Sequence, residues 1–473
     1  MVSKQDFKIN NYRARKIKDK YLVTTDHGSW IALDRESFLS LKRMKIKRNS
    51  KIFNELEEKG IVLTKDNIAQ IIEGLRGRYG FLLQGTSLHI VVPTLRCNMK
   101  CIYCHASSRL PNAKGYDMDK KTAKKIVDFI FQSPSRHITI EFQGGEPLLN
   151  FDIVKYIINY ANELNVFHNK DLLTSIVTNL TLMDGKKLDF LLNNNVTICT
   201  SLDGPKEVHD YNRAFIQGRG THAEVTKQIA RAGKIYAERG ITDRKMNALI
   251  TLTKKSLKYP KAIVDEYVKN NLTDIHLRFL NNLGCAKGAW VDISYSASDF
   301  IEFWKQAMDY IIKINKEGKP LRERIVMIIL KKILEKEDPN YVDLRSPCGA
   351  AIGQLVYDYD GSIYTCDEGR MLGEDVFKLG NAKNNNFREV LTSNHTCGIV
   401  AASANDVQIC DNCAYKPYCG ICPICNYAEQ GSIIAKIPQT DRCKIFKAQF
   451  DFVFDKLFND EVARKVFLSW VND

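Results

Sequence analysis

The chain lacks any long hydrophobic run. None of its 473 residues lies in a stretch approaching the ~18 consecutive apolar residues of a membrane-spanning helix, so no membrane contact is expected. The first eight residues contain no apolar segment of signal-peptide length either, and we therefore expect a cytoplasmic protein. In that compartment the 14 cysteines are expected to bind metal rather than to form disulfides.

An excess of acidic charge is also missing. Lys and Arg number 69 against 55 Asp and Glu, which gives a formal net charge of +14. Such a balance would allow nucleic-acid binding, but basic and acidic residues are interspersed along the whole chain, and we expect no nucleic-acid partner. The one basic cluster, residues 42–48, fits a solvated face, although it could also attract an acidic peptide. The length predicts two or three globular domains.

Three cysteines fall within eight residues with the spacing C-x3-C-x2-C: Cys97, Cys101 and Cys104. They follow an apolar stretch at 88–93 that is expected to form a buried strand. A structural zinc site takes four ligands, so three thiols leave it one ligand short. A [4Fe–4S] cluster held by three thiolates would instead keep one iron open to a ligand from solution. The spacing therefore favours a catalytic iron–sulfur cluster.

A Gly-Gly-Glu-Pro sequence at 144–147 ends the next strand-like stretch. Together with the cysteine motif it resembles radical S-adenosylmethionine (SAM) enzymes, in which a cluster loop follows the first strand and a glycine-rich SAM-binding turn follows the second. The resemblance implies a [4Fe–4S] cluster that binds SAM. Tyr103, just before the third cysteine, is expected to pack on the adenine or to cover the cluster. A plain turn beside a zinc site is the alternative.

Strand-like runs at 88–93, 138–143, 173–178, 196–201, 246–253 and 275–280 alternate with helical stretches. This pattern predicts an α/β fold with a parallel sheet, and six units fit the partial (β/α)6 barrel of the resembled family. Barrel active sites lie at the C-terminal ends of the strands, and Arg213 could pair there with the SAM carboxylate. The residues expected to contact SAM are Tyr103, Gly144, Gly145, Glu146, Pro147, Asn179, Ser201 and Arg213. No catalytic residue is predicted.

The C-terminal part holds a second group of cysteines, whose spacing resembles the SPASM extension of radical SAM enzymes. That extension carries two auxiliary [4Fe–4S] clusters. Matched residue by residue, one cluster is expected to take Cys410, Cys413, Cys419 and Cys443. C-x2-C pairs taken alone would favour zinc.

The other auxiliary cluster matches the extension less well. Its expected C-x3-C step would place a ligand at position 423, which is Pro423, so Cys422 is the predicted substitute and Cys425 the other choice. Its predicted ligands are therefore Cys348, Cys366 and Cys422. The fourth position is either open, closed by Cys397, or closed by another residue. Cys199 and Cys285 are expected to be small hydrophobic residues outside the site.

The N-terminal residues are predicted to form a separate unit, with strands at 21–25 and 28–33 and helices at 34–42 and 52–59. This pattern resembles the winged-helix-like domains that bind the leader of ribosomally made peptides by adding it to a sheet edge. A structural cap is the alternative. We expect a recognition domain at 1–85, the barrel at 86–300, bridging helices at 301–340, and the SPASM domain with a C-terminal helix at 341–473.

The combined resemblance is to radical SAM/SPASM peptide maturases, and among them to the His-Xaa-Ser system maturases, on stretches such as 140–147 and 415–423. It implies that a 5′-deoxyadenosyl radical takes a hydrogen atom from a ribosomally synthesised precursor peptide. The implied product is a side-chain cross-link, carbon–carbon and of the cyclophane type. The implied electron donor is a small flavodoxin- or ferredoxin-type protein. The alternatives are a sulfatase-maturating, formylglycine-forming enzyme and a zinc-ribbon nucleic-acid-binding protein.

Overall fold

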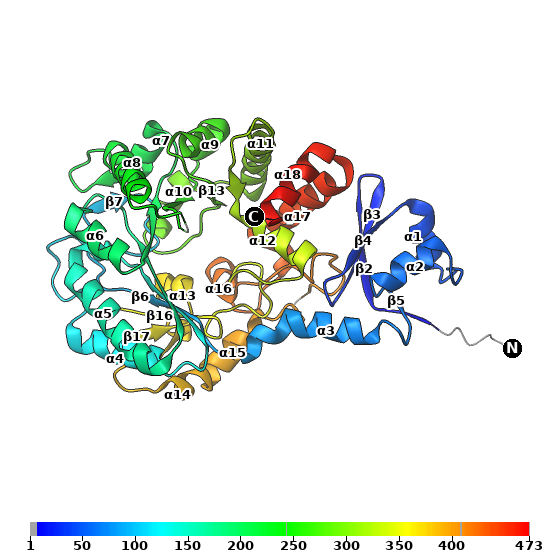
Figure 1. Ribbon diagram of the computed structural model, residues 1–473, viewed down its shortest axis with the longest axis horizontal. Helices are drawn as coiled ribbons and strands as arrows, with labels where there is room; N and C mark the ends of the chain where they lie inside the picture. Colours follow the sequence, from blue (N-terminus) through cyan, green and yellow to red (C-terminus); the bar gives the residue numbers. More distant parts are fainter. Residues whose placement is uncertain (1–6, 243, 407–408, 473) are drawn as a thin grey trace.

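A computed structural model describes residues 7–242, 244–406 and 409–472. Six parallel strands form the curved part of a central sheet (Figure 1). In sheet order they are β6 (Leu88–Val91), β8 (His137–Phe142), β9 (Asp171–Val177), β10 (Thr197–Ser201), β12 (Asn247–Thr251) and β14 (Leu277–Arg278). The predicted α/β barrel is thereby confirmed. Only its sixth run differs, because 275–280 is divided between β14 and the short β13 (Asp274–Ile275), which belongs to another sheet.

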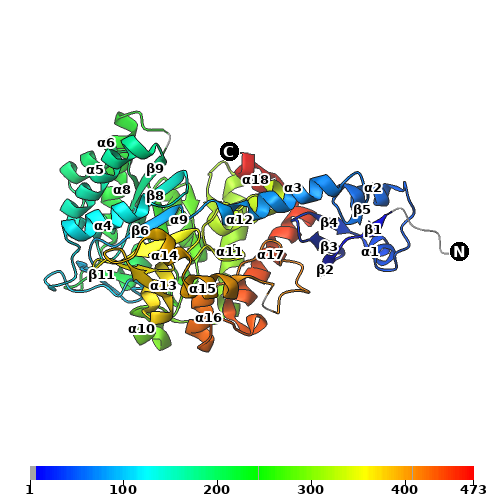
Figure 2. The same cartoon turned by 90° about the horizontal axis from the view of Figure 1, so that it is seen from below.

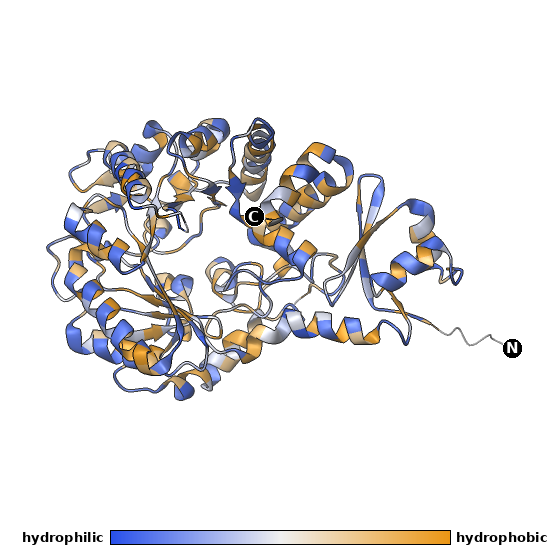
Figure 3. Ribbon diagram, viewed as in Figure 1, coloured by the Kyte–Doolittle hydropathy of each residue, from blue (hydrophilic) through white to orange (hydrophobic). Residues whose placement is uncertain are grey.

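Helices cover the outer face of this sheet (Figure 1). They are α4 (Lys120–Ile130), α5 (Phe151–His168), α6 (Gly185–Asn193), α8 (His222–Glu238) and α9 (Pro260–Lys269). In α4 the buried residues Ala123, Ile126, Val127 and Ile130 recur at helical spacing, so the helix has one apolar face. The strands are largely hydrophobic, and the helices carry their polar residues outward (Figure 3). This arrangement leaves the loops at the strand ends free to carry polar side chains.

The C-terminal cysteine region continues the same sheet beyond β6, which the sequence did not predict. β16 (Gln354–Tyr357) pairs with β6 in parallel, and β17 (Ser362–Tyr364) and β18 (Lys378–Asn381) follow as antiparallel strands. A buried hydrogen bond of 2.8 Å between Tyr357 Oη and His89 Nδ1 links the two regions. The C-terminal region is therefore built onto the strand that leads into the first cysteine motif.

Long helices fill the space between the barrel and the N-terminal unit (Figure 1). They are α11 (Ala297–Lys316), α12 (Arg324–Leu330), α17 (Asp441–Asn459) and α18 (Glu461–Asn472). The predicted bridging helices at 301–340 are interrupted by β15 (Arg322–Glu323), which pairs with β13. The Glu323 side chain then caps α12 by accepting a 2.9 Å hydrogen bond from the Val326 nitrogen. No helix in the described ranges is long and apolar enough to cross a membrane.

The N-terminal unit lies at one end of the molecule (Figures 1 and 2). Its elements are β2 (Tyr12–Ile17), β3 (Lys20–Thr25) and β4 (Trp30–Leu33) in one antiparallel sheet, with α1 (Arg35–Lys42), α2 (Lys51–Glu58) and the connecting α3 (Ile68–Tyr79). It has a hydrophobic core of its own around Val23, Phe53 and Leu56. Arg15 joins the unit to α17 through a 2.6 Å ion pair with Asp451.

Candidate functional site

The three cysteines of the first motif share the loop that follows β6. The nitrogen of Cys97 donates to the Arg109 carbonyl at 2.8 Å, which closes the loop on itself. Its middle forms β7 (Met99–Cys101), which pairs with β11 (Arg213–Phe215) so that Cys101 lies opposite Arg213. Cys97 is buried, and Cys101 and Cys104 are half-buried. Burial raises the pKa of Cys101 to about 11. The loop thus presents three thiols at the C-terminal edge of the sheet.

The glycine turn lies directly against the segment that enters the cysteine loop. A Cβ atom on Gly144, which has φ +128°, would lie 2.5 Å from the Thr94 carbonyl oxygen. A Cβ atom on Gly145 would lie 2.2 Å from the Arg96 carbonyl oxygen. The backbones also bond directly, from the Gly145 nitrogen to the Thr94 oxygen at 2.9 Å and from the Glu146 nitrogen to the Arg96 oxygen at 2.7 Å. Glycine is therefore required for this approach, whether or not SAM is bound.

Glu146 joins the ends of two strands from a buried position, where it is 1% exposed. Its carboxylate accepts hydrogen bonds from the Thr178 hydroxyl at 2.6 Å and from the Asn179 nitrogen at 2.8 Å, both just after β9. Burial raises the pKa of Glu146, and these hydrogen bonds oppose that rise. Pro147 is buried at the start of the short 3-10 helix η2 (Pro147–Asn150). Both side chains therefore hold the turn in place.

Tyr103 and Arg213, predicted separately, meet in one buried network with Asp203. The Tyr103 hydroxyl donates to Asp203 Oδ2 at 2.6 Å and accepts from Arg213 Nη1 at 2.7 Å. Burial raises the pKa of Asp203, while the nearby Arg213 charge and the hydrogen bonds lower it. Asn212 Nδ2 donates to the same carboxylate oxygen at 3.1 Å. From the sequence, Asp203 could either form part of a turn or contact SAM, and it was not among the predicted SAM contacts.

His209 supports this network from behind. Its Nδ1 accepts a 3.2 Å hydrogen bond from the Asp203 nitrogen, and its Nε2 lies 3.0 Å from the Thr221 hydroxyl. The Thr221 hydroxyl donates in turn to the Arg213 carbonyl at 2.8 Å. Burial lowers the pKa of His209 to about 3, so the ring is neutral at pH 7. His209 therefore fixes the backbone on both sides of the network.

Asn179 and Cys285 lie beside the cysteine loop, and Ser201 ends β10 in a half-buried position. Asn179 Nδ2 donates to Asn98 Oδ1 at 3.0 Å and lies 3.9 Å from Cys97 Sγ. Cys285 is exposed, so the expectation of a buried hydrophobic residue is wrong for it. Its nitrogen donates to the Cys104 carbonyl at 2.8 Å, and its thiol contact lowers the pKa of Cys104.

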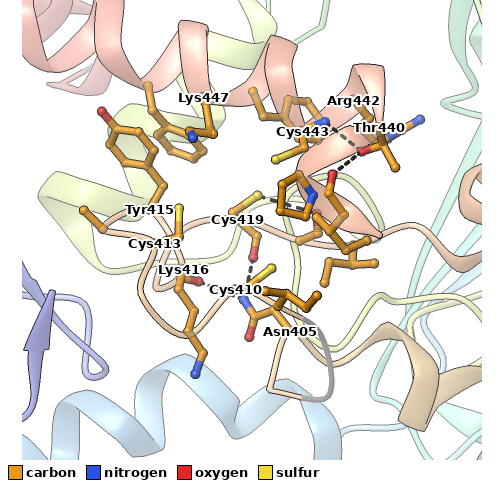
Figure 4. A pocket seen from close by; sticks show the side chains of 18 of the residues that line it. Asn405, Cys410, Cys413, Tyr415, Lys416, Cys419, Thr440, Arg442, Cys443 and Lys447 are labelled. Carbon is orange, nitrogen blue, oxygen red and sulfur yellow. Dashed lines mark hydrogen bonds between the residues drawn. The ribbon is translucent and has the colours of Figure 1, made fainter. Parts of the chain in front are cut away.

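Four C-terminal thiols surround a cavity of about 290 Å³ (Figure 4). They are Cys410, Cys413, Cys419 and Cys443, the set expected to bind one auxiliary cluster. The first three come from a loop of consecutive tight turns, and the fourth from the first turn of α17, where the Thr440 side chain caps the helix. Tyr415 and Lys447 complete the wall on the α17 side (Figure 4). The cavity leaves room between the sulfur atoms for a group larger than a single ion.

The remaining predicted ligands border a much smaller space, of about 10 Å³: Cys348, Cys366 and Cys422, together with Glu368 and Arg442. Cys425 borders a separate cavity of about 500 Å³, and its thiol also contacts that of Cys422. The Cys425 sulfur accepts from Arg442 Nη2 at 3.1 Å. Cys397 is exposed on α15 (Asn394–Ser403). This placement agrees with the choice of Cys422 over Cys425 as the third thiol.

Buried arginine N–H groups without a hydrogen-bond partner lie beside these thiols, and they indicate whether an anionic cluster fits there. In the described part of the chain, Nε of Arg345 and Nε of Arg442 are buried without a hydrogen-bond partner. Arg345 lies near Cys348, and Arg442 lies near Cys422 and Cys425. Buried guanidinium groups need a counter-charge, which a thiolate-bound cluster supplies. Among the same described residues, no three His, Cys, Asp or Glu side chains converge closely enough to hold a single metal ion.

Comparison with known proteins gives three findings. The sequence profile of the radical SAM superfamily matches residues 91–259. The chain is similar to the cysteine-type anaerobic sulfatase-maturating enzyme of Clostridium perfringens, with 26% identity over 384 residues that cover 79% of this chain and 97% of the relative.

Two solved structures share the fold. One is native anSMEcpe with bound AdoMet and Cp18Cys peptide, with a TM-score of 0.65 and 23% identity over 80% of this chain and 99% of that one. The other is Streptococcus suis SuiB bound to the precursor peptide SuiA, with a TM-score of 0.53 and 16% identity over 91% of this chain and 98% of that one.

These findings agree with what the residues show. The matched region spans the cysteine loop, the glycine turn and the Tyr103–Asp203–Arg213 network. A [4Fe–4S] cluster and SAM are the cofactors of this superfamily. The chain is an enzyme whose residues 91–259 match the radical SAM superfamily.

Proposed function

We propose that this enzyme joins side chains of a ribosomally made precursor peptide by radical chemistry. The observation that carries the proposal is that the C-terminal region, which extends the barrel sheet through β16 to β18, brings together two further groups of thiols. Cys97, Cys101 and Cys104 would hold the catalytic cluster. The C-terminal thiols would hold two clusters that take up the electron released when a cross-link forms. The wider resemblance to His-Xaa-Ser system maturases stays a prediction.

When bound, SAM and the reduced cluster supply a 5′-deoxyadenosyl radical that removes a hydrogen atom from a substrate carbon. The chain's own residues orient and enclose the reactants. The Gly144–Gly145 turn offers backbone groups at the edge of the thiol loop. Arg213 is held by Tyr103 and Asp203 with its guanidinium next to that loop, where a carboxylate could replace part of this contact. Asn179 adds an amide beside Cys97.

A peptide substrate is supported by the relatives and by the N-terminal sheet. Both the anSMEcpe and SuiB structures described above carry peptides. In the N-terminal sheet β2 and β4 are the edge strands. Side chains of β2, Arg13 and Arg15, hold the C-terminal region. We propose that a leader peptide adds to the edge of β4 rather than to that of β2, whose side chains are engaged with the C-terminal region. A small flavodoxin- or ferredoxin-type protein is the proposed electron donor.

Co-expression with a candidate precursor peptide tests the function. A cross-link is expected to remove two hydrogen atoms, read as a mass loss of about 2 Da that is absent with Cys97→Ala. Oxidation of Ser to formylglycine would give the same mass change. A hydrazide probe separates the two outcomes, because formylglycine carries an aldehyde and a cross-link does not. Labelling of the peptide would favour sulfatase-type maturation, and an unchanged mass would contradict both.

A further inference from the structure

The smaller group of C-terminal thiols has three cysteines and two carboxylates, those of Asp343 and Glu368. Cys348, Cys366 and Cys422 border a common space with Glu368. We propose that Glu368 is the fourth protein ligand of the auxiliary cluster at these three thiols. This inference rests on the proposed function, because it takes the thiols to hold a [4Fe–4S] cluster.

Position and hydrogen bonding prepare Glu368 for this role. It follows Cys366 by two residues, in the first turn of α13 (Asp367–Leu372), and its side chain is 13% exposed. Oε1 accepts a 2.8 Å hydrogen bond from Arg278 Nη2. Within the described ranges the other carboxylate oxygen takes part in no hydrogen bond, which leaves it available to a metal.

Two other cysteines, Cys425 and Cys397, compete for the fourth ligand position. Cys425 directs its sulfur to Arg442 Nη2 at 3.1 Å and borders the 500 Å³ cavity on the other side. Its thiol contacts the Cys422 thiol, and its backbone nitrogen donates to Cys422 Sγ at 3.4 Å, so Cys425 is the competing ligand that a Cys425 variant tests. Cys397 is exposed and borders neither space. Asp343 also borders the space of the three thiols, but its carboxylate pairs with Arg442 Nη1 at 3.3 Å, whereas Glu368 lies two residues after Cys366.

Carboxylate ligation would give this cluster a distinct chemistry. Oxygen is a harder donor than sulfur, so the iron bound to Glu368 is held less firmly than the three bound to thiolates. Because Arg278 is the last residue of β14, the ligand is tied to the final strand of the barrel. The fourth iron would therefore be the exchangeable position of this cluster.

The test compares the full chain with E368Q, C425S and D367N variants, all loaded anaerobically with iron and sulfide. Asp367 is the matched control, since its carboxylate faces Arg370 at 3.0 Å rather than the thiols. Iron content and EPR spectra are recorded after mild oxidation with ferricyanide. We expect E368Q to lose about one iron per chain and to gain the signal of a [3Fe–4S] cluster, while C425S and D367N match the wild type. E368D, which keeps the carboxylate at a shorter reach, is expected to lie between wild type and E368Q.

Other outcomes would overturn the assignment. Iron loss in C425S but not in E368Q would give the fourth position to Cys425. Unchanged iron in both would mean an iron open to solution. Two controls separate loss of the ligand from misfolding: the E368D variant, which keeps a carboxylate, and the thermal unfolding temperature of each iron-free variant. Peptide mass is measured in parallel on the wild type. If the wild type cross-links the peptide but the E368Q cluster is unaltered, the proposed function stands and the Glu368 ligand is refuted. If the E368Q cluster is altered but the wild type does not modify the peptide, the Glu368 ligand stands and the proposed function is refuted.

Discussion

The two groups of C-terminal thiols differ in how ready they are to receive a cluster. Cys410, Cys413, Cys419 and Cys443 surround an open cavity of about 290 Å³, whereas the thiols of the other group close on about 10 Å³. The open group comes from one loop and the start of one helix, and the closed group from three separate segments. We infer that the open group is preorganised, while the closed group must spread when its cluster binds, at a cost in folding free energy that metal binding offsets.

Their charges differ as well. The closed group lies among the guanidinium groups of Arg442, Arg345 and Arg278, which are largely buried. The open group shares Arg442 with the closed group and is otherwise bordered by Lys416, Lys447 and the N-terminal strand residue Arg15. Low local dielectric strengthens the effect of the arginines on a nearby anion. The closed centre is therefore expected to be the more easily reduced of the two.

Removing one thiol from each group gives the largest expected effects. Cys413→Ala and Cys366→Ala should each lose about four irons per chain and the cross-linked product, while 5′-deoxyadenosine formation continues. The iron-free proteins should differ, because Cys366 is packed and Cys413 borders open space. We expect Cys366→Ala to lower the free energy of unfolding by about 1 kcal/mol more than Cys413→Ala, measured by denaturant titration. Equal stability would contradict the contrast between closed and open groups.

Arg442 borders both cavities, and Arg442→Met is expected to affect the closed centre more than the open one. Arg442 Nη1 pairs with Asp343 at 3.3 Å, so its loss leaves a carboxylate without its partner. The iron-free protein should lose about 2 kcal/mol of stability. The reduction potential of the closed centre should fall, because a nearby positive charge is gone. Redox titration by EPR checks this, with Lys447→Met as the control near the open centre. A shift of the open centre only would contradict the prediction.

Acid should empty the closed centre first. Burial strongly raises the pKa of both Cys348 and Cys366 in the closed group, whereas in the open group it does so for Cys419 and raises the pKa of Cys410 to about 11. A thiol must lose its proton to bind iron, so iron affinity falls as pH falls, and a higher pKa makes that step more costly at any pH. Between about pH 8 and about pH 6, Cys413→Ala protein, which keeps only the closed centre, should lose auxiliary iron at higher pH than Cys366→Ala protein.

Arg15→Ala gives the smallest expected effect, and only at the open centre. Arg15 pairs with Asp451 at 2.6 Å and borders the open cavity. Because this pair is about one-third exposed, its loss should cost about 0.5 kcal/mol. Air bleaching of the open centre should accelerate, and that of the closed centre should not. Lys18→Ala, whose partner Asp455 lies further along α17, serves as the control.

Local spacing explains which parts of the site the sequence could predict. The loop of Cys97, Cys101 and Cys104 and the glycine turn each lie within one short segment, so their order along the chain was enough. Five of the six barrel strands have four or more residues and are rich in apolar and β-branched residues, which made them recognisable in the sequence. The added strands β16 to β18 are short and join the sheet through long-range pairing, which periodicity does not reveal.

Single residues that act through tertiary contacts were not predictable. Asp203 meets Tyr103 across 100 positions of sequence, and Cys285 reaches Cys104 only because Gly284, with φ +57°, lets the backbones approach. Glu368 is one of many acidic residues until the fold places it beside three thiols. Hydrophobic pattern and cysteine spacing contain no information on such pairs.

The most direct measurement is of 5′-deoxyadenosine, by mass spectrometry, after the reduced, iron-loaded protein is mixed with SAM. The variant with Cys97, Cys101 and Cys104 replaced by alanine serves as the control. We predict product from the wild type and from Cys366→Ala and Cys413→Ala, and none from the triple variant. Product from the triple variant, or none from an iron-loaded wild type supplied with its precursor peptide, would contradict the assignment of the catalytic cluster to this loop.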